Sequence, residues 1–405
     1  MTGDAELILV AGALLAAGVV ASIVADRLRL PALVLFLGVG MAIGTDGLGW
    51  IDFEDYERAR LIGSAALSLV LFEGGFGAGW SRIRPFLRPA VSLAVIATIG
   101  TAAVAGLAAA ALFDLSGREG LLVGAIVSGT DGAAVFALLR GTPLPARLAR
   151  TLEGEAGFND PVAVLLVLVI IELITKGSYG ATDIIVFVGR ELLVGVATGL
   201  GVGWVAARTL RNVRATPTGI VLVASLASAA VAFGLAGVAH GSGFLAVYLV
   251  GLQLADAELP ERAALRAFHE GLAAVAEIVL FLALGLLVFP SQLDNVALKA
   301  TVLGLVVAFI ARPLSAAMAT AFEPQFGGRD RVLLGWAGLR GAVPVVLAAL
   351  PVIENIHRSL EFFNIVFFTV LVSTLIQGST VGMLARRLKL SIDAAEGDTA
   401  EQATA

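Results

Sequence analysis

Long runs of apolar residues without a charged side chain constrain this chain more than any other feature. Residues 89–113 and 362–385 contain no Asp, Glu, Lys or Arg within their apolar stretches. A helix needs about 20 predominantly apolar residues to cross the hydrocarbon core of a bilayer. Charged residues make up 15% of the chain, whereas a soluble protein carries about 25%. The sequence therefore predicts an all-helical protein that crosses a membrane many times.

Thirteen membrane-spanning helices are predicted from these runs. The stretch 215–255 also lacks Asp, Glu, Lys and Arg, but it is too long for one crossing. The glycines and serine at 240–243 divide it into two spans. The expected spans are 6–25, 30–46, 61–79, 89–113, 120–139, 151–174, 184–207, 215–237, 242–255, 267–289, 296–320, 330–352 and 361–385.

Basic residues alternate between the connections of these spans. The odd-numbered connections, with the segment after the last span, hold 18 of the 27 Lys and Arg residues, and the even-numbered ones hold 6. Lys and Arg collect in cytoplasmic loops. This predicts a multi-pass protein of the cell inner membrane, with its N-terminus outside and its C-terminus in the cytoplasm. No Lys or Arg precedes residue 27, so the first span is expected to be retained rather than cleaved as a signal peptide.

Composition narrows the remaining possibilities. The chain has no cysteine and three scattered histidines, which excludes disulfides and disfavours a histidine-based metal site. We expect no cofactor, no nucleic-acid partner and no enzymatic activity. Residues 1–390 are predicted to form a single transmembrane unit. Residues 391–405 are small, polar and acidic, and are expected to form a disordered cytoplasmic tail.

Asp131 lies at the centre of the fifth expected span, in the run from Val127 to Gly132. A charged group at the bilayer centre costs about 2.5–3.5 kcal/mol on insertion scales, so its presence calls for a reason. Two glycines and two hydroxyl residues around it weaken the helix locally. The pattern favours a broken helix whose carboxylate and freed carbonyls bind a cation. The alternative interpretation is a kinked helix with an acid that faces a water pocket.

Asp160 follows Asn159 and precedes Pro161 in the sixth expected span. As a buried carboxylate it would bind either a proton or a hard monovalent cation, which prefers oxygen ligands. On local sequence alone, a second interpretation competes: an Asp before Pro also caps the start of a helix. Asp131 lies one helix away along the chain, across a short loop. This proximity favours the cation-binding interpretation of Asp160.

Glu155 lies four residues before Asn159, so the two share one face of a helix. A buried acid needs a cation, and the candidates within spans are Arg312 and Arg340. We interpret one or both as structural counter-charges to Glu155. The sequence does not choose between them, and each arginine has the alternative of extending to the membrane interface. Glu191, next to Arg190, is expected to lie at a span edge with a structural role.

The twelfth span carries a second candidate for a broken helix, because Gly338, Arg340, Gly341 and Pro344 interrupt it. Interrupted spans at corresponding positions of two halves are typical of secondary transporters with inverted repeats. The first break lies in the fifth of spans one to six, and the second lies in the fifth of spans eight to thirteen. The seventh span then connects two six-helix repeats of opposite orientation.

These residues resemble a known family. The resemblance rests on four motifs: Thr130-Asp131, Glu155 with Asn159-Asp160, Arg312-Pro313, and the run from Gly338 to Gly341. They are similar to those of the monovalent cation:proton antiporters of the NhaP and sodium/proton exchanger group, and most similar to the bacterial potassium/proton, cell-volume-regulation branch. The resemblance covers all thirteen spans.

The resemblance implies an NhaA-like antiporter fold and an exchange of K⁺ or Na⁺ for protons. Asp160 would be the main carboxylate for cation and proton, with Asp131, the Thr130 backbone and Asn159 beside it. The family also implies a homodimer, with a dimerisation domain from spans one to three and eight to ten. The transport core would come from spans four to six and eleven to thirteen.

Two features of the sequence refine this expectation. Ala156 stands where many sodium-selective members have Ser, which favours K⁺ or mixed selectivity. Asn159 in place of a second Asp leaves one titrating carboxylate at that position, which predicts electroneutral exchange. A sodium-selective exchanger and a cation channel remain as alternatives. An intramembrane aspartyl protease fits poorly, since that chemistry needs two carboxylates that share a proton, usually in a Gly-x-Gly-Asp context absent here.

Overall fold

A computed structural model describes residues 2–28, 31–53, 55–130, 132, 135, 144–176, 180–212, 217–259, 261–288 and 290–390. All regular structure in this part of the chain is helical, which confirms the predicted all-α class. Asp131 and the predicted tail at 391–405 lie outside the described residues.

The described part of the chain forms α-helices, one 3₁₀ helix (η1) and three π-helical segments (η2, η3 and η4). In chain order they are α1 (Thr2–Leu28), α2 (Ala32–Ile43), α3 (Tyr56–Ala78), α4 (Trp80–Ile83), η1 (Arg84–Phe86), α5 (Leu87–Ser92), η2 (Leu93–Ala97), α6 (Thr98–Phe113), α7 (Gly117–Ser128), α9 (Ala146–Thr175), α10 (Ala181–Arg211), α11 (Thr218–Val238), α12 (Gly243–Asp256), α13 (Arg262–Leu286), α14 (Pro290–Val306), η3 (Val307–Ala311), α15 (Arg312–Ala319), α16 (Gly328–Trp336), α17 (Ala342–Ile353), α18 (Ser359–Ser373), η4 (Thr374–Gly378) and α19 (Ser379–Arg387).

Among the described residues, nine helical stretches are long and apolar enough to cross a membrane. Three shorter apolar helices, at Ala32–Ile43, Gly243–Asp256 and Val343–Ile353, accompany them. Each span expected from the sequence overlaps a helix, and the expected break at 240–243 separates α11 from α12. The chain is therefore a polytopic membrane protein.

Two helices are interrupted. The first, α7, ends at Ser128, whose hydroxyl donates to the carbonyl of Ala125 at 2.7 Å, and Gly129 continues in an extended conformation (φ −56°, ψ 139°). The second interruption separates α16 from α17 at residues 337–341 and ends at Gly341 (φ −153°, ψ −128°). Glycine and serine favour such breaks because they stabilise a helix poorly.

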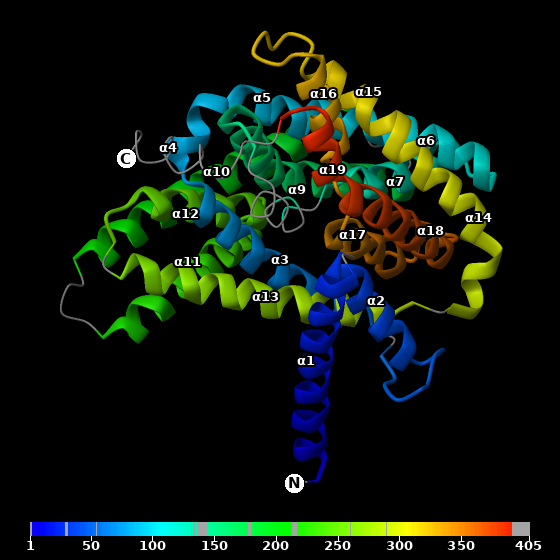
Figure 1. The fold of residues 1–405 in the computed structure, drawn as a ribbon, viewed down its shortest axis with the longest axis horizontal. Coiled ribbons are helices and arrows are strands. Elements are labelled where there is room, and N and C mark those ends of the chain that lie inside the picture. The colour runs from blue at the N-terminus through cyan, green and yellow to red at the C-terminus, as the bar shows by residue number, and fades with distance from the viewer. Residues whose placement is uncertain are drawn as a thin grey trace.

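The helices form two bundles, which lie side by side in Figure 1. The first bundle consists of α1–α3 and α10–α13, and within it α12 packs on α3 and α10, and α13 on α2 and α3. The second bundle consists of α4–α9 and α14–α19, and within it α6 packs on α7, and α14 and α17 on α18. The long helix α9 belongs to the second bundle and also contacts α3 and α12 of the first. The N-terminal half of α1 projects away from both bundles (Figure 1).

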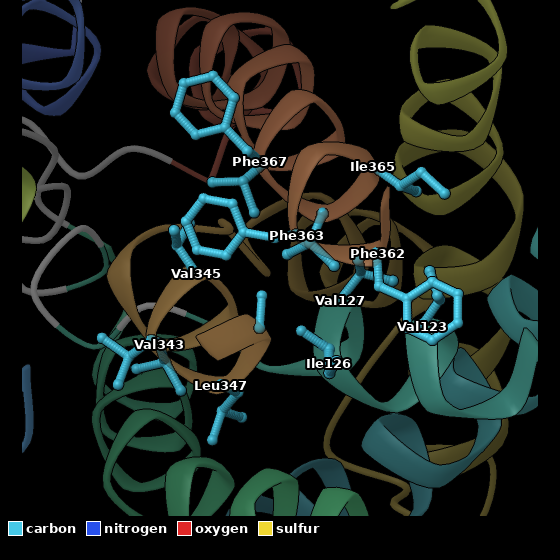
Figure 2. Packing of buried hydrophobic residues seen from close by; sticks show 14 of the residues in the cluster. Val123, Ile126, Val127, Val343, Val345, Leu347, Phe362, Phe363, Ile365 and Phe367 are labelled. Carbon is cyan, nitrogen blue, oxygen red and sulfur yellow. The ribbon is translucent and has the colours of Figure 1, made fainter. Parts of the chain in front are cut away.

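The apolar core of the second bundle surrounds the two interruptions. Figure 2 shows side chains of α7, α17 and α18 packed against one another. Val127, immediately before the first break, and Phe367 of α18 are fully buried. This packing fixes the ends of α7 and α17, and therefore the backbone between the broken halves, in one place.

Candidate functional site

The helix α9 carries three buried polar side chains within two turns. Glu155, Asn159 and Asp160 are 2%, 0% and 3% exposed. Because α9 begins at Ala146, Asp160 lies in the middle of a helix, and the alternative interpretation of Asp160 as a helix cap is wrong. Pro161 lies inside the same helix and lacks an N–H, so the carbonyl of Gly157 loses its intrahelical donor.

Asn159 joins α9 to the first break and to α6. Its Nδ2 donates to Thr98 Oγ1 at 2.6 Å. Its Oδ1 accepts from the backbone N–H of Thr130 at 3.0 Å. Both ends of the amide are thus engaged, so Asn159 positions the broken backbone beside Asp160. The side-chain oxygen of Thr130 is itself buried and makes no hydrogen bond with the described residues.

Thr98 was not identified from the sequence. It lies in the uncharged span 89–113, where a threonine gives no signal because its hydroxyl can bond within its own helix. In the structure it immediately follows the π-helical segment η2, Leu93–Ala97. Arg312 follows the π-helical segment η3, Val307–Ala311, in the same way. Segments of this kind occur frequently at functional sites, where they redirect side chains.

Asp160 lies at the wall of a cavity of about 330 Å³ between the two bundles. The cavity extends from Asp160 to Leu168 along α9, which is about 12 Å at 1.5 Å per residue. Its opposite walls come from α3, α17 and the turn between α11 and α12. The cavity therefore extends from Asp160 toward the end of the molecule where α9 ends and α10 begins.

On the other side of Asp160, the two bundles are in direct contact. The fully buried ring of Tyr248 on α12 lies against Gly157 of α9, where an added Cβ would overlap the ring. The Tyr248 hydroxyl donates to the carbonyl of Glu153 at 3.2 Å. Phe158 meets the same ring edge-on, with centroids 5.4 Å apart. This contact closes the route from Asp160 toward the start of α9.

Glu155 forms an ion pair with Arg312, through Oε1 and Nη2. Both side chains are buried, with exposed fractions of 3% and 0%, so Arg312 does not extend to an interface. The backbone of Gly338 packs directly on this guanidinium, and an added Cβ there would overlap Arg312 Nε and Cζ. A glycine is thus required at the second break because the arginine occupies the space of a side chain.

Arg340 does not make this ion pair. It is 0% exposed and lies in the connection between α16 and α17. Its Nη1 donates to the carbonyl of Gly338 at 2.6 Å, and its own carbonyl accepts from Thr374 Oγ1 at 2.5 Å. Arg340 therefore holds the non-helical backbone of the second break in shape, and Thr374, in the π-helical segment η4, helps to hold it.

The site offers oxygen ligands to a small cation. Asp160 supplies a carboxylate, and the break after Ser128 leaves backbone groups without helical partners. Within the described residues, no group of three or more His, Cys, Asp or Glu side chains is placed to hold a metal ion. Carboxylate and carbonyl oxygens are the ligand types that hard cations prefer.

Comparisons with known proteins agree with this geometry. The family model described as sodium/hydrogen exchanger, transmembrane, matches residues 12–387. A K⁺/H⁺ antiporter NhaP of Alkalimonas amylolytica is 40% identical over 395 residues, which cover 96% of this chain and 68% of that protein. A K⁺/H⁺ antiporter NhaP2 of Shewanella oneidensis is 38% identical over 384 residues, which cover 94% of this chain and 67% of that protein. The chain thus spans about two thirds of the length of these relatives.

A solved structure has the same fold. The sodium proton antiporter MjNhaP1 from Methanocaldococcus jannaschii superposes with a TM-score of 0.80 and 24% sequence identity. The match covers 95% of this chain and 99% of that one.

Proposed function

Because this chain belongs to the sodium/hydrogen exchanger family, we propose that it is a secondary antiporter that exchanges protons for K⁺ at Asp160. The observation that carries the proposal is the position of Asp160, a buried carboxylate at the wall of a cavity that is open toward one end of α9 and closed toward the other. Such a group binds a proton or a cation in turn, and each ion displaces the other.

K⁺ is the proposed substrate for two reasons. The two curated relatives described above, at 40% and 38% identity, are named as K⁺/H⁺ antiporters. In this chain Ala156 adds no hydroxyl ligand beside Asp160, which suits an ion that is less strongly hydrated than Na⁺. Thr130 and Asp131 complete the proposed cation site, and Asn159 holds the Thr130 backbone in place.

The proposed mechanism is alternating access. The second bundle acts as the transport core and moves against the first, which acts as the scaffold and dimerisation domain of a homodimer. The proposed topology has thirteen crossings, with the N-terminus outside the cell inner membrane and the C-terminus in the cytoplasm. In that orientation α9 runs outward, so the cavity beyond Asp160 opens to the outside and the Tyr248 contact closes the inside.

The second bundle also supports the proposal of two inverted six-helix repeats. A π-helical segment precedes Thr98 in the fourth span and Arg312 in the eleventh, and an interruption follows in the next span in each case. Both features recur at the same position of each half, as expected for repeats.

The test is proton movement in proteoliposomes that contain the purified chain, with K⁺, Na⁺ and Li⁺ compared at several pH values. For the wild type we expect K⁺-driven proton efflux, at a rate independent of a clamped membrane potential, because one cation exchanges for one proton. The variant Asp160→Asn should reduce the flux to the level of empty liposomes while it keeps its folded yield. The exposed control Glu57→Gln should transport normally. Unchanged flux in Asp160→Asn contradicts the assignment, and flux that follows the potential favours a channel.

A further inference from the structure

The cavity beside Asp160 has a second acidic side chain in its wall. Glu191 lies ten residues into α10, is half-buried, and lines the cavity. It lines the same cavity as Asp160, and these two are the acids among the described lining residues. The backbone carbonyl of Glu191 accepts from the N–H of Ser242 at 3.0 Å, which fixes this part of α10 to the turn between α11 and α12.

No structural ion pair holds the carboxylate of Glu191 among the described residues. Within the described residues it makes no ion pair, although Arg190 and His240 lie close enough to interact with it electrostatically. A structural acid inside a span is normally paired, as Glu155 is paired with Arg312. Glu191 instead faces the water-accessible space that leads to Asp160. Its sequence position predicts a structural role at a span edge, and the cavity geometry points to a different one.

A basic side chain opposes it. Arg60, on the first turns of α3, is exposed and lines the same cavity. Most of the remaining wall near Asp160 is apolar, with Leu67, Val164 and Val346 among its residues. Apolar walls of low dielectric focus the field of the few charges present, and thereby change the local concentration of a charged substrate. The negative charge of Glu191 thus favours the approach of a cation to Asp160, and the positive charge of Arg60 disfavours it.

We propose that Glu191 recruits the transported cation, that is, attracts it into the cavity and thereby sets the apparent KM for cation supplied to this face. The positive charge of Arg60 opposes this attraction. This inference rests on the proposed antiport function and adds the residues that govern access. Glu191 does not bind the cation at the transport site, so the maximal rate and the order of preference among cations should not depend on it. The apparent KM measured from the face where the cavity opens should depend on it.

The test compares apparent KM for K⁺ in everted and in right-side-out membrane vesicles. For Glu191→Gln we expect the KM to rise about tenfold, at the lower end of electrostatic focusing, in the one orientation where K⁺ is supplied to the cavity face. The maximal rate should stay within the scatter of the wild type. Glu191→Asp should retain most of the wild-type affinity, and Arg60→Gln should lower the KM.

Two controls separate recruitment from a structural effect. Glu57→Gln removes an acid one turn from Arg60 that does not line this cavity, and it should leave the KM unchanged. Added non-transported salt should shrink part of the difference between wild type and Glu191→Gln, since ions in the water-accessible cavity screen the charge of Glu191. An equal change of KM in both orientations, an unchanged KM, or a loss of maximal rate alone overturns the inference. A wild type without K⁺-dependent proton flux overturns the proposed function, and this inference with it.

Discussion

At the scale of single residues, the ion pair of Glu155 and Arg312 places the strictest condition on folding, because both charges are buried inside the second bundle. Removal of one partner leaves the other charge buried and uncompensated. A buried pair broken in this way typically costs about 3–5 kcal/mol, whereas an apolar replacement of both partners is often neutral. The pair therefore matters for folding even if it adds little net stability.

We predict that Arg312→Ala lowers the free energy of unfolding by about 3–5 kcal/mol and sharply reduces the folded yield. The double variant Glu155→Leu with Arg312→Met should recover much of that loss. Thermal unfolding in detergent, monitored by intrinsic fluorescence, measures both. Arg266→Ala is the matched control, since its pair with Glu270 is solvent-exposed, and such pairs contribute about 0–1 kcal/mol. Equal losses in Arg312→Ala and Arg266→Ala would contradict the burial argument.

Thr98 supports a second prediction at this scale. Thr98→Val keeps the shape of the side chain but removes the acceptor of Asn159 Nδ2. A buried donor left unsatisfied costs about 1–3 kcal/mol, and the apparent cation affinity should fall because Asn159 holds the Thr130 backbone. Thr101→Val, one turn further along α6, is the control, because Thr101 Oγ1 is buried without a hydrogen bond to the described residues. It should be nearly neutral in both thermal unfolding and transport assays.

The sequence was sufficient to name the ionic residues but not their partners. Charged residues in apolar spans stand out individually, so Glu155, Arg312 and Arg340 were identified. Which arginine reaches Glu155 depends on how α15 and the second break pack against α9, and no local pattern contains that information. Thr98 and Tyr248 were missed for a related reason, since uncharged polar side chains are ordinary in membrane helices.

At the scale of elements, each expected span overlaps a helix, because an apolar run long enough to cross a bilayer has few other uses. The break expected at residues 338–344, within the span 330–352, corresponds to the interruption between α16 and α17. The π-helical segments η2, η3 and η4 were not predicted, because each inserts an extra residue into a helix without a change in composition. The segments η2 and η3 end immediately before Thr98 and Arg312, the side chains that contact Asn159 and Glu155 of α9.

Close approach of α6 and α7 gives a prediction for one helix pair. A Cβ added at Gly124 of α7 would overlap the backbone of Ala102 and Gly106 on α6, which cannot move without displacing the helix. Gly124→Ala should therefore separate the two helices, shift the first break, and destabilise the fold by about 1–3 kcal/mol, as overpacking does. In Gly201→Ala, on α10, the added Cβ meets open space, so the same substitution should be neutral or slightly stabilising there. Unfolding temperatures of the two variants provide the comparison.

At the scale of the whole molecule, the proposed alternating access assigns to the contact between the two bundles the choice of which side of the membrane reaches Asp160. The cavity extends along one half of α9, and Tyr248 of the first bundle covers Gly157 of the second on the other half. Alternating access requires this contact to separate and the cavity to close. The glycine allows the ring to lie against the helix, so the size of the side chain at 157 determines how stable the closed contact is.

We therefore predict that Gly157→Ala destabilises the conformation described here, because the new Cβ and the Tyr248 ring compete for the same space. The population should shift toward the state that is open on the Tyr248 side. A thiol-reactive label should then react faster with a cysteine introduced at Phe158, from the side where α9 begins. Transport should slow, since the return to the other state becomes the limiting step.

A compensating pair makes this prediction specific. Gly157→Ala with Tyr248→Leu replaces the ring by a smaller apolar side chain, which leaves room for the new Cβ and still fills the contact, so it should restore slow labelling if steric conflict is the cause. Tyr248→Phe keeps the ring and loses the hydrogen bond to the Glu153 carbonyl, so it should shift the population far less. If Gly157→Ala unfolds the protein instead, the double variant should restore the folded yield. Labelling that is unchanged in folded Gly157→Ala means that the two bundles separate elsewhere, and that Tyr248 does not control access to Asp160.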